Sequence, residues 1–271
     1  MFPPSTPAAS SRDRMSADPA GPTGRRPVPP YTAGRILTVW AGAVVPMGLL
    51  AWVVAPAVAP AFGGGATGLA KALLTCLTVG LAWQFVLVMT LVQREQGSLR
   101  WSVLRDALWL HGPEHPRTHR PHRRAWWWLV PLVIGFGAEQ FVPSPPPVTG
   151  RDLGTFLDSP AGRTMFHGAW GWFAVVALLV ILNTVLGEEL LFRGFLLPRM
   201  GTAFGRADWV VNGLLFALYH VHTPWAIPGA LLDTVMLSWP SRRFRSAWFG
   251  IVVHSAQSLV ILAVVLALVL R

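Results

Sequence analysis

Charged residues are scarce in this chain, and cysteine is almost absent. Only 13% of the 271 side chains are charged, against about 25% in a typical soluble domain. This low fraction argues against an ordinary soluble domain and indicates a chain that lies in lipid. Cys76 is the single cysteine, so the chain cannot form an intrachain disulfide, and we expect Cys76 to be a small buried residue.

Long apolar runs fill most of the sequence. Residues 172–187 contain no ionisable side chain, and residues 252–270 contain only His254. A helix of about 20 apolar residues crosses the roughly 30 Å of hydrocarbon in a bilayer, and it satisfies its own backbone hydrogen bonds there. We therefore predict an all-α fold, a polytopic transmembrane bundle of about seven spans, at 36–61, 69–92, 125–142, 165–190, 209–221, 225–239 and 246–270.

The basic residues predict an orientation in the cell membrane. The net charge is +10, and all but one of the basic residues are arginine. They gather before the first span and in alternate loops, which predicts a multi-pass protein with a cytoplasmic N-terminus and gives no reason to expect nucleic acid as a partner. Residues 1–30 lack an apolar stretch and are expected to be a disordered cytoplasmic tail. Residues 31–271 form the membrane domain, with 165–270 as its catalytic core.

Four acidic residues fall within the predicted spans: Glu139, Glu188, Glu189 and Asp233. A carboxylate inside a bilayer is costly, so each one is a candidate for function. Glu189 and Arg193 are four residues apart on one helix face and can form an ion pair. Glu188 lies about 100° around the same helix and is left free for another role.

Two histidines reach a similar depth in the predicted membrane. Counting about 1.5 Å per residue from the cytoplasmic helix ends places His254 roughly 13 Å deep. The same count places His220 and Glu188 about 17 Å deep. Three rare polar groups on three helices at one level predict a common site.

This set of side chains predicts hydrolysis. A glutamate in apolar surroundings is a good general base, and with a histidine it can deprotonate a trapped water that attacks a peptide carbonyl. The second histidine can donate to the developing oxyanion. The alternative is a metal site in which Glu188, His220 and His254 bind Zn²⁺, because three protein ligands and a water form a known catalytic pattern. The sequence leaves both open.

The motifs carrying these residues resemble those of the CAAX protease and bacteriocin-processing (CPBP, or Abi) family of intramembrane proteases. Glu188, Glu189 and Arg193 match its EExxxR motif, Phe216 and His220 match FxxxH, and His254 matches the histidine of HxxxN/D. The resemblance implies that Glu188 and His220 activate water, that Glu189 and Arg193 support the site, and that His254 helps to stabilise the oxyanion.

One position departs from the family pattern. Ser258 stands where the family carries Asn or Asp, and a serine hydroxyl reaches less far than an amide. Gln257 is a neighbouring substitute. The prediction is an intramembrane endopeptidase acting on a peptide or membrane-protein substrate. The alternative is an inactive scaffold or immunity protein of the same fold. The sequence indicates neither the exact substrate nor the oligomeric state.

Overall fold

The computed structural model describes residues 28–271, and these residues form helices and loops without a β-strand. The predicted all-α fold is confirmed. Almost all of the predicted N-terminal tail, residues 1–30, lies outside the described residues.

Four helical stretches among the described residues are long and apolar enough to cross a membrane. The first, Ala33–Phe62, joins α1 (Ala33–Leu49), a π-helical segment η1 (Leu50–Val54), α2 (Ala55–Val58) and a 3-10 turn η2 (Ala59–Phe62). The second is α3 (Gly65–Gln96), the third is Trp170–Arg199 and the fourth is α14 (Trp248–Leu270). The chain is therefore a membrane protein.

The other three predicted spans correspond to shorter helices. They are α5 (Leu129–Gly137), α11 (Asp208–Tyr219), and the group α12 (Ile227–Ala230), η10 (Thr234–Ser238) and α13 (Trp239–Phe244). Helix is thus present at every predicted place, while the count of seven crossings stays a prediction. Short helices connect these elements: α4 (Trp101–Ala107), α6 (Leu153–Asp158), α7 (Pro160–Phe166) and α10 (Gly201–Phe204).

Both predicted boundaries of the fourth span are wrong. The fourth predicted span began at residue 165, but the chain turns at Gly168, where φ is +65°, and a new helix begins at Trp170. A left-handed glycine commonly ends a helix because it has no Cβ to clash. The span then continues past residue 190 to Arg199.

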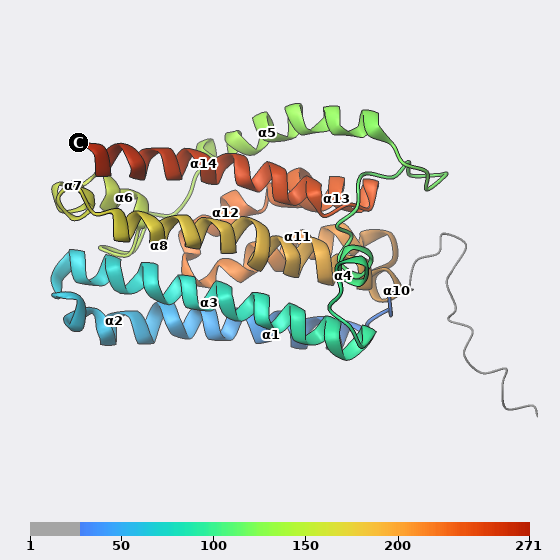
Figure 1. Ribbon diagram of the computed structural model, residues 1–271, viewed down its shortest axis with the longest axis horizontal. Helices are drawn as coiled ribbons and strands as arrows, with labels where there is room; N and C mark the ends of the chain where they lie inside the picture. Colours follow the sequence, from blue (N-terminus) through green and yellow to red (C-terminus); the bar gives the residue numbers. More distant parts are fainter. Residues whose placement is uncertain (1–27) are drawn as a thin grey trace, which may run out of the picture.

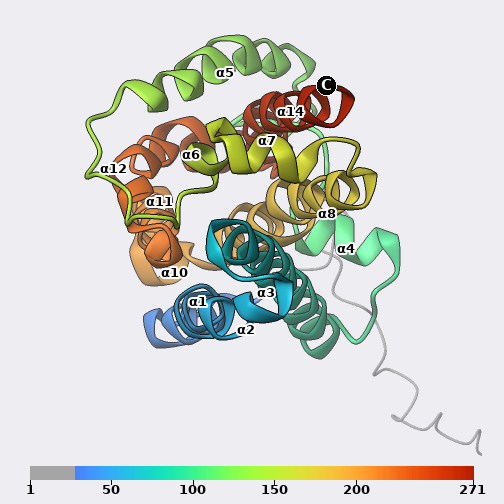
Figure 2. The ribbon, with the colours of Figure 1, turned by 90° about the vertical axis from the view of Figure 1, so that its left-hand side faces the viewer.

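The long helices lie side by side along the long axis of the molecule (Figure 1). α1 and α3 form one side of the bundle, α14 and α5 form the other, and α8 (Trp170–Ile181) and α11 lie between them (Figures 1 and 2). The largest buried apolar cluster joins α1, α3, α11 and α14 to the third span. The polar site described below lies within this layered packing.

A polar clamp joins the ends of three elements at one end of the bundle. Arg199 Nη2 lies 2.7 Å from Glu95 Oε2, and the Tyr31 hydroxyl also donates to Glu95. Burial and the adjacent Glu95 carboxylate raise the pKa of Tyr31 to about 12, so its hydroxyl remains a donor at neutral pH. The clamp fixes the end of the third span against α3.

The third span is interrupted by two π-helical segments. After α8 come η5 (Leu182–Gly187) and η6 (Leu190–Leu196), and α9 (Leu197–Arg199) completes it. Glu188 and Glu189 lie between the two π segments. π turns are rare and are often found at functional sites.

Candidate active site

The Glu189–Arg193 ion pair lies in the centre of the bundle. Arg193 Nη1 is 3.0 Å from Glu189 Oε1, and both side chains are fully buried. The guanidinium lies over the ring of Phe216 at 4.0 Å from the ring centre, a cation–π contact. Phe216 therefore supports the arginine of the preceding motif, which gives a physical reason for pairing an EExxxR segment with an FxxxH segment.

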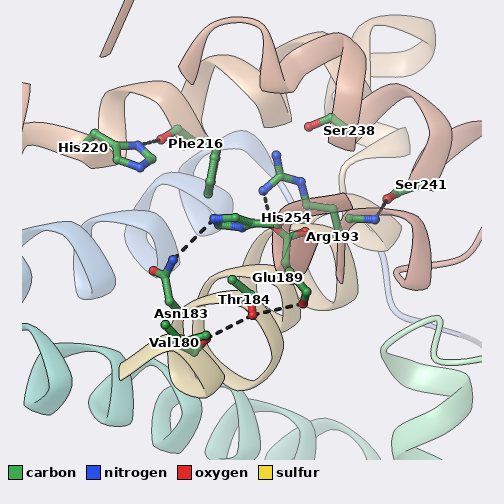
Figure 3. A network of polar contacts seen from close by, with 12 residues as sticks. Val180, Asn183, Thr184, Glu189, Arg193, Phe216, His220, Ser238, Ser241 and His254 are labelled. Carbon is green, nitrogen blue, oxygen red and sulfur yellow. Dashed lines mark hydrogen bonds and ion pairs between the residues drawn. The ribbon is translucent and has the colours of Figure 1, made fainter. Parts of the chain in front are cut away.

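His254 of α14 joins this pair. Its Nδ1 lies 3.0 Å from the same Glu189 Oε1, so one carboxylate oxygen holds both Arg193 and His254 (Figure 3). A carboxylate only accepts, so Nδ1 carries the proton and Nε2 faces the rest of the site. Gly250, one turn earlier on α14, permits this approach, because a Cβ there would lie only 2.1 Å from Glu189 Oε2.

Glu188 is also buried, at 2% exposure, but it faces a different set of partners. The Asn183 side chain lies between Glu188 and His254. Its amide donates to Glu188 Oε1 at 2.7 Å in the orientation that its surroundings favour. Its oxygen then faces His254 Nε2, with 3.4 Å between the paired atoms of the two side chains. Asn183 thus links the candidate base to the histidine of the last motif.

A second neutral side chain contacts Glu188 from α11. The Tyr219 hydroxyl donates to the Glu188 carboxylate and accepts a 2.6 Å hydrogen bond from Gln84 Nε2. Both Tyr219 and Gln84 are fully buried. Gln84 belongs to α3, so the N-terminal half of the chain reaches the candidate base through one intermediate residue.

His220 lies at the end of α11, half-buried. Its Nδ1 is 3.0 Å from the Phe216 carbonyl oxygen, so Nδ1 is the protonated nitrogen and Nε2 is free to accept a proton. The Phe216 ring stands edge-on to both histidines, with ring centres 5.0 Å from His220 and 6.2 Å from His254. The ring of His222 stacks on His220 at 5.5 Å.

Ser258, one turn after His254, is buried and lines an apolar cavity of about 200 Å³. Asn183 lines the same cavity, and the remaining wall is formed by apolar side chains and the backbone of Gly154. Gln257 instead faces away, and its amide approaches Glu139 at 3.5 Å. The two candidates for the family's Asn position therefore point to different surroundings.

Asp233 is buried at 3% exposure, and its Oδ1 has no hydrogen-bond partner among the residues that the structure describes. Its carboxylate interacts electrostatically with Glu139, Arg193 and His254. It is therefore a part of the polar interior of the bundle and not an exposed surface residue.

The metal alternative has no support in this arrangement. Within residues 28–271, no three His, Cys, Asp or Glu side chains lie close enough together to hold a metal ion. Glu188 and His254 both contact the Asn183 side chain, whereas His220 contacts the Phe216 carbonyl oxygen. The placement of these residues therefore does not support the metalloprotease description.

Three residues of the site were missed by the sequence reasoning: Asn183, Tyr219 and Gln84. All three are neutral, whereas the sequence prediction rests on the charged groups and histidines in the apolar runs. Gln84 carried a usable signal, since an amide in the middle of a predicted span needs a buried partner. For Tyr219, the available signal was its position next to His220.

These features define a helical membrane protein with a buried Glu/Glu/Arg/His cluster assembled from the third span and α14. The family model described as type II CAAX prenyl endopeptidase Rce1-like matches residues 170–260. This match confirms the resemblance to the CPBP family over the segment that carries all the motifs, and it indicates a CAAX protease-type intramembrane endopeptidase. No curated protein and no solved structure matches the chain.

Proposed function

We propose that this protein hydrolyses a peptide bond inside the membrane with a water activated by Glu188 and His220. The single observation that carries the proposal is the division of roles between two adjacent glutamates. Glu189 is committed to Arg193 and His254, while the hydrogen bonds of Glu188 within residues 28–271 come from neutral donors, Asn183 and Tyr219. A carboxylate without a buried counter-ion in direct contact can take up a proton.

In the proposed reaction, the water oxygen attacks the carbonyl carbon while Glu188 takes a proton from the water. The free Nε2 of His220 is an acceptor that can hold the same water in place. Glu188 then returns the proton to the amide nitrogen as the carbon–nitrogen bond breaks. The products are a carboxylic acid and an amine, which become a carboxylate and an ammonium by proton exchange, so atoms and protons balance.

The developing oxyanion needs donors. His254 Nε2 faces the site because Glu189 holds Nδ1, and a protonated His254 would donate from both nitrogens. Ser258 is the second candidate donor from the same helix. Preorganised donors of this kind contribute about 2.7–4 kcal/mol each in other hydrolases.

The apolar cavity beside Asn183 and Ser258 supports a substrate with an apolar group near the cleaved bond. Its volume of about 200 Å³ accommodates an apolar side chain or part of a lipid chain. A peptide with a prenylated cysteine, as in the description of the matching family, is one such substrate. An apolar bacteriocin precursor or signal peptide is another.

The test uses the purified full chain in detergent with two fluorescence-quenched peptides of one sequence, with and without a prenylated cysteine. We expect cleavage at one bond, identified by mass spectrometry, and faster cleavage of the prenylated peptide. The Glu188→Gln variant is the control. Equal cleavage by that variant would exclude Glu188 as the base.

The second candidate function is an inactive scaffold of the same fold, which Ser258 favours because it replaces the family's Asn or Asp. In that case the wild type and Glu188→Gln would be equally inactive on every peptide, and Ser258→Asn would not create activity. Activity gained by Ser258→Asn alone would show an attenuated enzyme instead.

The proposed orientation has a separate test. Ala61→Cys and Arg206→Cys place thiols at exposed positions that the arginine pattern predicts on opposite faces of the membrane. A membrane-impermeant reagent should label them from opposite sides. Labelling from one side would contradict the predicted topology.

A further inference from the structure

Two cavities meet at a pair of tryptophans away from the candidate active site. The first, of about 270 Å³, is lined by Arg242, Arg243, Arg245 and His119, together with Trp209 and Trp239. The second, of about 430 Å³, shares Trp209 and Trp239. The two therefore adjoin at these rings, and they differ sharply in chemistry.

The first cavity is basic. Arg242 pairs with Asp208, and Arg245 Nε lies 3.4 Å from Glu114 Oε2. Arg243 is exposed and has no ion-pair partner among the described residues. The three arginines carry three positive charges and their two carboxylate partners carry two negative charges, so a net charge of +1 remains. His119 forms part of the cavity wall. A phosphodiester carries one negative charge, and arginine forks bind phosphate oxygens in pairs.

The second cavity is apolar. Its wall includes Trp128 and Leu132 from the η3 (Arg123–Trp128) and α5 side, and Val235 and Met236 from η10. Trp128 and Val235 are each 47% exposed, and α5 lies at the edge of the bundle (Figure 2). Exposed apolar side chains on a membrane protein face the hydrocarbon of the lipid.

We propose that these adjoining cavities bind one anionic phospholipid. The phosphate would lie among Arg242, Arg243 and Arg245, and an acyl chain would follow the apolar groove between α5 and η10. Tryptophans are typical of the membrane interface, where headgroup and acyl chain meet.

This site does not depend on the proposed protease activity. It shares no residue with the cluster around Glu188 and His254, and basic pockets between membrane helices are known to take anionic headgroups. A soluble phosphate ester would satisfy the basic cavity but would leave the apolar groove without a role. The lipid is therefore the occupant that accounts for both.

The test measures lipid binding to the purified full chain by native mass spectrometry, with phosphatidylglycerol and phosphatidylcholine of matched acyl chains. We expect preferential binding of phosphatidylglycerol. Arg243→Gln should weaken it about fivefold, as expected for the loss of one arginine near an anionic lipid. Arg206→Gln, a change at an exposed arginine outside both cavities, should weaken it less than twofold. Equal binding of both lipids, or equal effects of the two variants, would overturn the proposal.

A second arm separates a lipid from a free anion. Val235→Trp fills the apolar groove from an exposed position and should also weaken phosphatidylglycerol binding, by about fivefold or more. Glycerol 3-phosphate at millimolar concentration should not displace the lipid from the wild type. Full displacement by glycerol 3-phosphate, or unchanged binding in Val235→Trp, would mean that only a soluble-anion site exists. Melting temperatures of all variants are compared to confirm that each is folded.

Discussion

Two long helices of nearly equal length contribute to the candidate site in different ways. α3 is a regular α-helix of 32 residues, and it contributes the neutral Gln84. Trp170–Arg199 has 30 residues, contains two π segments and carries Glu188, Glu189 and Arg193. The first lies outside the segment matched by the family model, and the whole of the second lies inside it.

The difference teaches that an irregular backbone alone does not mark a site. The segment η1 is also π-helical, yet its sequence, LAWVV, is entirely apolar. In the third span the π turns coincide with buried charges, and there the structure assembles the candidate site. The regular helix provides a fixed surface, and the irregular helix presents the groups that can react. The following predictions test this division, from the largest expected effect to the smallest.

Glu188→Gln removes the candidate base while keeping the shape of the side chain. Turnover should fall by about 10²–10⁴-fold, the range for loss of general acid–base catalysis, with little change in melting temperature. The measurement is peptide cleavage by the purified protein. Glu139→Gln, which changes an acid at the edge of the bundle, is the matched control and should retain most of the activity.

Arg193→Ala should act on stability. It leaves the buried Glu189 carboxylate without its strongest partner, and breaking a buried pair costs about 3–5 kcal/mol. Thermal unfolding in detergent should show a large loss for this variant and almost none for Arg206→Ala. Adding Glu189→Gln to Arg193→Ala should recover part of the loss. A melting temperature like that of the wild type in Arg193→Ala would contradict the importance of the pair.

Ser258→Ala should lower turnover about 10- to 100-fold if the serine hydroxyl assists the oxyanion, less than the 10²–10³ typical of a direct donor. Ser258→Asn should retain or raise activity. Gln257→Ala should have the smaller effect, because Gln257 faces Glu139 and not the cavity. If Gln257→Ala were the more damaging change on the same peptide, the assignment of Ser258 would be wrong.

Tyr219→Phe and Gln84→Leu test whether α3 contributes to catalysis. Each removes one neutral hydrogen-bonding group, worth about 0.5–1.5 kcal/mol, from the chain of contacts that ends on Glu188. We expect turnover to fall about tenfold for Tyr219→Phe and about threefold for Gln84→Leu, with KM nearly unchanged. Because both act through one hydroxyl, the double variant should resemble Tyr219→Phe alone. Additive effects, or a change in KM only, would show that Gln84 has a packing role.

The sequence predicts the fold and the charged part of this site well. Apolar runs specify membrane helices directly, and the four-residue spacing of Glu189 and Arg193 is enough to foresee their ion pair. The π segments η5 and η6 could not be predicted from the sequence, because a π turn is stabilised by the tertiary packing around it and leaves no periodic pattern. The break at Gly168 was missed because the apolar pair Met165 and Phe166 was joined to the long apolar run that begins at Ala169.

Contacts between neutral side chains were harder to predict from the sequence. Nothing local distinguishes Gln84 from other polar residues in apolar helices until α11 is packed against α3 and brings Tyr219 within 2.6 Å. Glu189 can bind both Arg193 and His254 because Gly250 leaves room for its carboxylate. The sequence does not reveal this, because the contact exists only once α14 is packed against the third span. The roles of the catalytic candidates stay predictions.

The clamp of Tyr31, Glu95 and Arg199 also fixes how the third span is rotated about its own axis. Arg199 is 11 residues after Glu188, and each residue added between them would rotate the helix about its axis, by about 100° in its α-helical part and by less in the π segment η6. With one end of the helix held against α3, a single inserted or deleted residue between these positions would swing the carboxylate of Glu188 away from Tyr219. The length of this segment is therefore as constrained as its composition. Insertions beyond Arg199 should be tolerated better, because they leave the rotation of Glu188 about the helix axis relative to the clamp unchanged.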